Sequence, residues 1–246
     1  MPSLYRVHDG PPAERVEKLK AFLGELGLAL HKGKLGPVPK DYQKLLASIQ
    51  GRPDFHLIQT VMLRSLSQAV YSAENNGHFG LNYEAYTHFT SPIRRYPDLL
   101  VHRALRYAIS GGKASGYAYS PTQMGTMSVH CSNNERRAQE AERDVDERYK
   151  CAWMEKHVGS TFAGVVSGVT SFGLFVELSE SRINGLVHIT QLPNDYYHFD
   201  PKRHLLTGER RGLKFRLGDP VHVQVLRASL EDRKIDLRLA ADPAGR

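Results

Sequence analysis

Apolar residues recur three and four positions apart through the first two-thirds of the chain, a spacing that is typical of helices. The first such run follows Pro11-Pro12 and predicts an amphipathic helix over about 12–26. Further runs predict a short helix around 42–49 and a longer one from 53 toward 71, after a glycine- and proline-bearing loop over 32–39. Alternating residues over 81–85 predict an extended segment.

Two proline-bearing signals predict further helix starts. Ser91-Pro92 places a capping serine before proline at the first helical position, and the helix is expected to run to Gly111-Gly112. Pro97 must lie in the first turns of this helix or reset its start. The sequence Ser-Pro-Thr-Gln at 120–123 is a capping box that opens another helix. That helix continues to about 152 and is predicted to be the longest element of the chain.

The pattern changes at Gly159 to short alternating runs. Five strands are predicted, over 161–169, 174–178, 186–189, 221–226 and 234–239. Five strands with glycine-bearing turns are typical of a small Greek-key barrel, the OB-fold. The long polar interval 191–216 is predicted to be an insertion loop or a short helix. Helices followed by a barrel give an α+β fold with a domain boundary near 157–160.

The size and charge of the chain limit its class. Its 246 residues suffice for two domains, each with its own core. A count of 33 Lys and Arg against 26 Asp and Glu gives a formal charge of +7, which favours a polyanionic partner. Cys131 and Cys151 lack the spacing of a metal site or a disulfide framework, and no apolar run is long enough to span a bilayer. We therefore expect a cytoplasmic protein with reduced thiols and no membrane partner.

Arg94 and Arg95 stand next to the predicted helix start at Ser91. A helix N-terminus presents unpaired backbone N–H groups and a positive dipole, and guanidinium groups add planar donors that suit phosphate. The arrangement predicts a phosphate-binding site. The alternative is that the arginines form ion pairs with acids such as Glu84 or Asp98, and the residue pattern alone leaves both readings open.

The second predicted strand of the barrel carries an aromatic side chain on its outer face. Alternation puts Leu174, Val176 and Leu178 on the core face and Phe175 on the opposite one, beside Glu177. An aromatic ring on the wet face of such a barrel is suited to stacking against a nucleic-acid base. The predicted stacking platform consists of Phe172, Phe175 and His188. The alternative is that the two phenylalanines close the mouth of the barrel.

Other charged side chains give weaker evidence for nucleic-acid or metal binding. Arg233 and Lys234 are predicted to neutralise a nucleic-acid backbone, with a solvated turn as the alternative. The acids of the long predicted helix alternate with arginines, which is typical of a solvated face, although one of them could face a bound nucleotide. The twelve histidines have no metal-ligand spacing, and there is no compact Asp-rich loop. No metal ligands are therefore predicted in this sequence.

The stretch HFTSPIRRYPDLLVHR at 88–103 resembles the signature of the RNB family of exoribonucleases. Supporting stretches are LYRVHDGPPAE at 4–14, GRPDFHLIQTVMLRS at 51–65, ENNGHFGL at 74–81 and AERDVDE at 141–147. The region from Phe162 resembles the OB-type RNA-binding domain named after ribosomal protein S1, which follows the catalytic domain in that family. The resemblance covers essentially the whole chain.

The resemblance implies three parts: a mostly helical C-terminal part of an RNB catalytic domain over 1–158, an OB-fold RNA-binding domain over 159–241 and a tail over 242–246. Members of the family degrade RNA processively from the 3′ end to nucleoside 5′-monophosphates, with magnesium. By resemblance, Arg94 contacts the scissile phosphate and stabilises the charge that develops there. Glu142 would lie near the terminal nucleotides. The probable lining of the pocket, again by resemblance, is Ser91, Arg95 and Tyr96.

The family's magnesium-binding aspartates and its cold-shock domains have no counterpart in this sequence. We therefore expect a fragment that binds single-stranded RNA without hydrolysing it and that needs the missing N-terminal half of the catalytic domain as a partner. The intact protein is expected to be a monomer. The alternative is a non-catalytic RNA-binding adaptor whose helical part docks to another protein.

Overall fold

The computed structural model describes residues 1–31, 36–52, 54–201 and 203–240. The chain divides into two compact units. The first unit comprises residues 1–20, 28–50 and 61–140, and the second comprises residues 21–27, 51–60 and 141–246. Helices and strands are both present in quantity, which confirms the α+β fold class. The predicted tail over 242–246 and residues 32–35 of the predicted loop over 32–39 lie outside the described residues.

The described residues up to Ser72 contain three short helices and a two-stranded sheet. The helices are α1 (Ala13–Glu25), α2 (Pro39–Ser48) and α3 (Phe55–Ser65), and the strands are β1 (Tyr5–Val7) and β2 (Val70–Ser72). The predicted helices over 12–26 and 42–49 are confirmed. The third prediction was too long, because α3 ends at Ser65 and Val70–Ser72 pairs antiparallel with β1. The valine and tyrosine of that segment favour a strand.

Residues 81–85 do not form the predicted extended segment. Leu81 ends the 3-10 helix η1 (Phe79–Leu81), and Asn82 adopts the left-handed conformation with φ of 55°. The backbone N–H of His78 donates to the carbonyl of Tyr83 at 2.8 Å, which closes the segment into a compact turn. Asparagine tolerates the left-handed region better than other side chains do, and this local turn displaces the strand.

The helix does not begin at Ser91-Pro92, and its start is reset at Pro97, the second of the two predicted alternatives. Helix α4 runs over Tyr96–Ile109, with Pro97 in its first turn and Arg95 at its N-cap. Pro97 lacks an N–H group and fixes φ, so it is compatible with the first turn of a helix and incompatible with its interior. A helix from Ser91 would place Pro97 in the interior, and the chain forms a separate turn over Ser91–Arg95 instead.

The capping box at 120–123 is confirmed. The backbone N–H of Gln123 donates to Ser120 Oγ at 3.2 Å, and the N–H of Ser120 donates to Gln123 Oε1 at 2.8 Å. Helix α5 (Pro121–Glu155) follows the short 3-10 helix η2 (Ala114–Gly116) and is the longest described element, with 35 residues. Leu4, Leu100 and Met124 form a small core cluster of the first unit.

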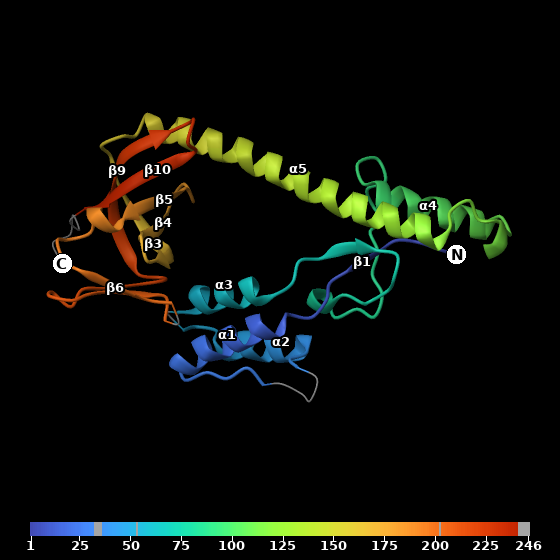
Figure 1. The fold of residues 1–246 in the computed structure, drawn as a ribbon, viewed down its shortest axis with the longest axis horizontal. Helices are drawn as coiled ribbons and strands as arrows, with labels where there is room; N and C mark the ends of the chain where they lie inside the picture. Colours follow the sequence, from blue (N-terminus) through green and yellow to red (C-terminus); the bar gives the residue numbers. More distant parts are fainter. Residues whose placement is uncertain (32–35, 53, 202, 241–246) are drawn as a thin grey trace. The chain divides into compact units, whose positions relative to one another are not determined.

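The second unit contains a closed five-stranded barrel, which confirms the predicted OB-type architecture (Figure 1). Its strands are β3 (Thr161–Thr170), β4 (Gly173–Leu178), β5 (Asn184–His188), β9 (Pro220–Ser229) and β10 (Lys234–Leu239). They follow the order β10-β5-β4-β3-β9, with only β10 and β5 parallel among the described pairs. Cys151 and Met154, from the last turns of α5, contribute to the barrel core.

The interval 191–216 is neither an unstructured loop nor a helix, so this prediction was wrong. After a 3-10 turn, η3 (Ile189–Gln191), it forms a three-stranded antiparallel sheet. The strands are β6 (Tyr197–Asp200), β7 (Leu205–Gly208) and β8 (Lys214–Arg216). Phe199, Leu206 and Phe215 face one another across these strands and pack against the barrel core. Burial of one apolar face stabilises this short sheet despite its polar composition.

No helix within the described ranges is long and apolar enough to cross a membrane.

Candidate nucleic-acid interface

The turn before α4 is tied to the helix by one buried carboxylate. The backbone N–H groups of Arg94 and Arg95 donate to the carbonyl of Ser91 at 3.2 and 2.9 Å. Asp98 Oδ2 accepts from the backbone N–H of Ser91 and from the Arg95 guanidinium, each at 2.8 Å. The Asp98 side chain is completely buried, so this interaction lies in a region of low dielectric. The first helical turn therefore holds the preceding loop in a fixed conformation.

The two adjacent arginines have different environments. Arg95 forms the ion pair with Asp98, and its side chain is only 23% exposed. Arg94 is exposed, and no hydrogen bond or ion pair joins its side chain to any part of the chain that the structure describes. The alternative reading, an ion pair with Asp98, therefore holds for Arg95 and not for Arg94. Arg94 is left available for an anion, on a turn that the Arg95–Asp98 pair makes rigid.

This buried pair retains two polar atoms without a partner. Arg95 Nε and Asp98 Oδ1 are buried and have no hydrogen-bond partner among the described residues. Unsatisfied buried polar atoms weaken the net stabilisation that an ion pair provides. The pair is therefore better understood as fixing the geometry of the turn than as a large source of stability.

Aromatic side chains surround the turn. Tyr96 is exposed, and the Arg103 guanidinium lies 5.8 Å from the centre of its ring. Phe89 stacks on His102 with ring centres 4.2 Å apart. Ser91 is half-buried. The structure thus brings Ser91, Arg94, Arg95 and Tyr96 together, with only Arg94 and Tyr96 well exposed.

A buried polar network lies on the other side of the signature segment. Tyr71 is bonded through its hydroxyl to His88 Nδ1 at 2.9 Å, and Arg6 pairs with Glu135 at 2.6 Å. Burial raises the pKa of Tyr71 to about 12. Burial, together with the Arg95 charge, lowers the pKa of His88 below 6.5. Both groups are therefore neutral near pH 7.

The barrel carries the predicted aromatic platform on its outer face. Leu174, Val176 and Leu178 are buried in the core, as predicted, and Phe175 is half-buried on the opposite face. Its ring lies against Gly168, where a Cβ atom would come within 3.3 Å of it. Phe172 meets Phe175 edge-on, with ring centres 6.0 Å apart.

His188 completes this group from the neighbouring strand. It is exposed at the end of β5, where it pairs with Gly173 across the sheet. Phe172 and Phe175 both lie outside the described core cluster of the barrel. The two phenylalanines are therefore not part of the barrel core, and the pairing of Gly173 with His188 places Phe172 and His188 at the same end of β4 and β5.

The remaining predicted residues differ in availability. Arg233 forms an ion pair with Asp144 of α5, so its charge is already partly neutralised. Lys234 is exposed at the start of β10. Glu142 is exposed on α5 and belongs to the second unit, whereas Arg94 belongs to the first.

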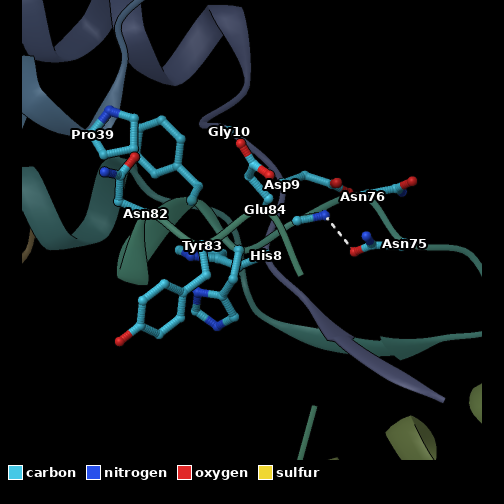
Figure 2. Close-up of a pocket in the computed structure, with 12 residues that line it drawn as sticks. His8, Asp9, Gly10, Pro39, Asn75, Asn76, Asn82, Tyr83 and Glu84 are labelled. Atoms are coloured by element: carbon cyan, nitrogen blue, oxygen red, sulfur yellow. Dashed lines mark hydrogen bonds between the residues drawn. The ribbon is translucent and has the colours of Figure 1, made fainter. Parts of the chain in front are cut away.

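A pocket of about 530 Å³ lies in the first unit, but it does not contain the predicted site. It is formed by the loop after β1, the start of α2 and residues 75–84 (Figure 2). Asp9 and Glu84 place two carboxylates on its wall, and none of its described lining residues is a lysine or an arginine. Such a wall disfavours phosphate. None of the predicted RNA-contacting residues lines this pocket.

The described residues also provide no magnesium site. Magnesium is bound through clustered oxygen ligands, most often carboxylates. No group of three or more His, Cys, Asp or Glu side chains within the described ranges is arranged to hold a metal ion. These residues therefore do not account for the metal that the family resemblance implies.

Sequence comparison relates these features to known proteins. Residues 1–111 match the RNB domain, and residues 155–239 match the S1 RNA binding domain. The first part of the chain therefore matches an RNB domain, and the last part matches an S1 RNA binding domain. It is 52% identical over 246 residues to ribonuclease R of Vibrio cholerae, in an alignment that covers 96% of this chain and 30% of that protein. This chain thus spans about a third of the length of this curated relative.

Solved structures of RNase R have the same fold. The apo form of Mycoplasma genitalium RNase R matches 98% of this chain and 38% of its own, with 26% identity and a TM-score of 0.87. The same enzyme in complex with ribose-methylated single-stranded RNA matches with a TM-score of 0.85, also at 26% identity and with the same coverage. The mixed helical and barrel architecture is therefore that of the corresponding part of RNase R.

Proposed function

We propose that this chain is the RNA-holding part of a ribonuclease R-like 3′-to-5′ exoribonuclease. In this proposal the helical part supplies Arg94 to the scissile phosphate, and the barrel binds the single strand. The intact enzyme would release nucleoside 5′-monophosphates processively. The match to the RNB domain and the 52% identity to a ribonuclease R support the proposed activity.

The observation that carries the proposal is the different environment of the two arginines. Arg94 is exposed and unpaired among the described residues, while Arg95 and Asp98 hold its turn rigid. A cation held in advance at the position where negative charge develops costs little reorganisation during the reaction. Tyr96 and Ser91 would line the same pocket, and Glu142 would lie near the terminal nucleotides.

The barrel supports the second half of the proposal. Phe172, Phe175 and His188 offer ring faces on which successive bases stack without sequence preference. Lys234 adds backbone-neutralising charge beside the Arg233–Asp144 pair. Mycoplasma genitalium RNase R, a solved structure with the same fold, is in complex with ribose-methylated single-stranded RNA, which supports single-stranded RNA as the ligand class.

Magnesium enters the proposal only through residues outside this chain. We infer that its ligands belong to the remaining part of the RNB catalytic domain, which would act as the partner of this chain. The present residues would then bind and orient RNA and stabilise developing charge, and the chain alone would not hydrolyse RNA.

Replacement of the matching segment in Vibrio cholerae ribonuclease R by this chain tests the proposal. The purified 246-residue chain is expected to bind a single-stranded RNA without shortening it. The chimera is expected to release mononucleotides in the presence of magnesium. A chimera that folds and binds RNA without cleaving it would favour the non-catalytic adaptor instead, and mononucleotide release by the isolated chain would contradict the proposed division of roles.

A further inference from the structure

We propose that the sheet inserted between β5 and β9 forms a second contact surface for single-stranded RNA, separate from the aromatic platform of the barrel. This inference deepens the proposed function and depends on it. We call this surface the basic hairpin face. It consists of Tyr196, His198, Arg210, Arg211, Lys214 and Arg216.

The strand register determines which side chains share this face. His198, Thr207 and Lys214 lie opposite one another across the three strands, and Arg216 lies opposite Leu205. Residues two apart on a strand point to the same side, so Lys214 and Arg216 share one face of β8. The opposite face is packed on the barrel core. The polar face is therefore directed outward, and His198, Lys214 and Arg216 are all exposed.

The four cations of this face are not neutralised by ion pairs. No hydrogen bond or ion pair joins the side chains of Arg210, Arg211, Lys214 and Arg216 to another described residue. The acid of the same hairpin, Glu209, is bonded to His198 at 3.2 Å. By contrast, Arg203 nearby is paired with Glu25 at 2.8 Å. Four unpaired cations within seven residues produce a local positive potential.

The turn that carries two of these cations is held in place. Asp195 accepts hydrogen bonds from the backbone N–H groups of Arg210 and Arg211, at 2.9 and 2.8 Å. Gly212, with φ of 65°, closes the turn through a 3.1 Å bond to the carbonyl of Gly208. Asp195 uses its oxygens for these backbone groups and forms no ion pair with either guanidinium group, although the Arg210 charge helps to lower the pKa of Asp195. A fixed backbone reduces the entropy lost when those side chains bind a ligand.

An exposed aromatic pair accompanies these cations. Tyr196 is 66% exposed, and His198 meets its ring edge-on with ring centres 5.0 Å apart. Unpaired cations next to exposed ring faces are typical of surfaces that bind single strands, where cations contact phosphates and rings stack on bases. The shape and charge of the face therefore fit single-stranded RNA.

Salt-dependent binding measurements test this inference on the full chain. The double variant Lys214→Gln/Arg216→Gln is compared with Lys40→Gln/Lys44→Gln, which removes the same charge from exposed positions on α2. A labelled single-stranded RNA about 20 nucleotides long is titrated by fluorescence anisotropy across a range of salt concentrations. Each lost phosphate contact is expected to reduce the slope of log K against log salt concentration by about 0.7.

The expected result is a slope reduced by about 1.4 in Lys214→Gln/Arg216→Gln, with the control close to wild type. Tyr196→Ala is expected to weaken binding at an unchanged slope, because the tyrosine side chain is uncharged and its removal changes no counterion release. A double variant with the slope of wild type, or a control that changes equally, would overturn the inference. If the slope of the double variant is unchanged while wild type binds RNA and Phe175→Ala weakens that binding, the inference fails and the proposed function stands. A wild-type chain that binds no RNA would contradict both the inference and the proposed function.

Discussion

At the scale of single residues, the buried pair of Arg95 and Asp98 separates a structural arginine from an available one. Asp98→Asn keeps the shape of the side chain and an oxygen for the Ser91 N–H, but it leaves Arg95 without a counter-charge. Removal of one partner of a buried pair is strongly destabilising. Because Arg95 is partly exposed, we expect a loss of about 3 kcal/mol in the free energy of unfolding.

Urea denaturation of the full chain measures this loss. Arg94→Ala is the matched control, since Arg94 has no described partner and its removal should leave the free energy of unfolding nearly unchanged. Equal destabilisation by the two variants would show that the pair does not support the turn.

At the scale of elements, β4 has one face for the core and one for a ligand. Phe175→Ala is expected to weaken single-stranded RNA binding by roughly 1–3 kcal/mol, the usual contribution of one stacked base. Leu174→Ala, on the core face next to it, should instead destabilise the fold by roughly 2–5 kcal/mol. Titration of labelled RNA together with thermal unfolding distinguishes the two. An unchanged affinity in folded Phe175→Ala would remove the ring from the RNA surface.

The segment that joins η1 to the signature turn is expected to be sensitive to acid. Burial lowers the pKa of His88 and of His78, so the folded state favours their neutral forms. Their contribution to stability is complete above the unfolded value of 6.5, and it is lost as the pH falls from there through the lower folded values.

The free energy of unfolding should therefore decrease between pH 7.5 and 5.5, and His88→Gln should reduce that decrease. The two proteins can be compared by urea denaturation at both values of pH. A decrease of the same size in the variant would exclude His88 as its source.

At the scale of the whole molecule, periodicity predicted the barrel, its core face and the longest helix from sequence. These elements depend on patterns among neighbouring residues. Buried and outward-facing residues alternate along β4, and Ser120 and Gln123 cap the start of α5 reciprocally. The sequence left the start of α4 open between Ser91-Pro92 and a reset at Pro97, and the structure selects the second, with Asp98 buried in the first turn. The sheet over 197–216 was missed because its apolar residues are few and become informative only once the barrel core is present to cover them.

The separate environments of Arg94 and Arg95 also required the fold. The two arginines are adjacent, so no pattern in the sequence distinguishes their roles. The turn over Ser91–Arg95 directs Arg95 toward Asp98 and Arg94 toward solvent. The four cations over 210–216 form a cluster that is visible in the sequence. The hydrogen bonds of Asp195 that hold their turn, and the burial of the opposite face of the sheet, depend on tertiary structure.

The most direct test of the account is the turnover of the chimera with Arg94→Ala, measured beside its affinity for single-stranded RNA. If Arg94 stabilises the negative charge that develops at the scissile phosphate, kcat should fall by about 100-fold or more while Kd changes by less than about threefold. An unchanged kcat, or a loss of affinity that accounts for the whole effect, would contradict the assignment of Arg94 to the reacting phosphate.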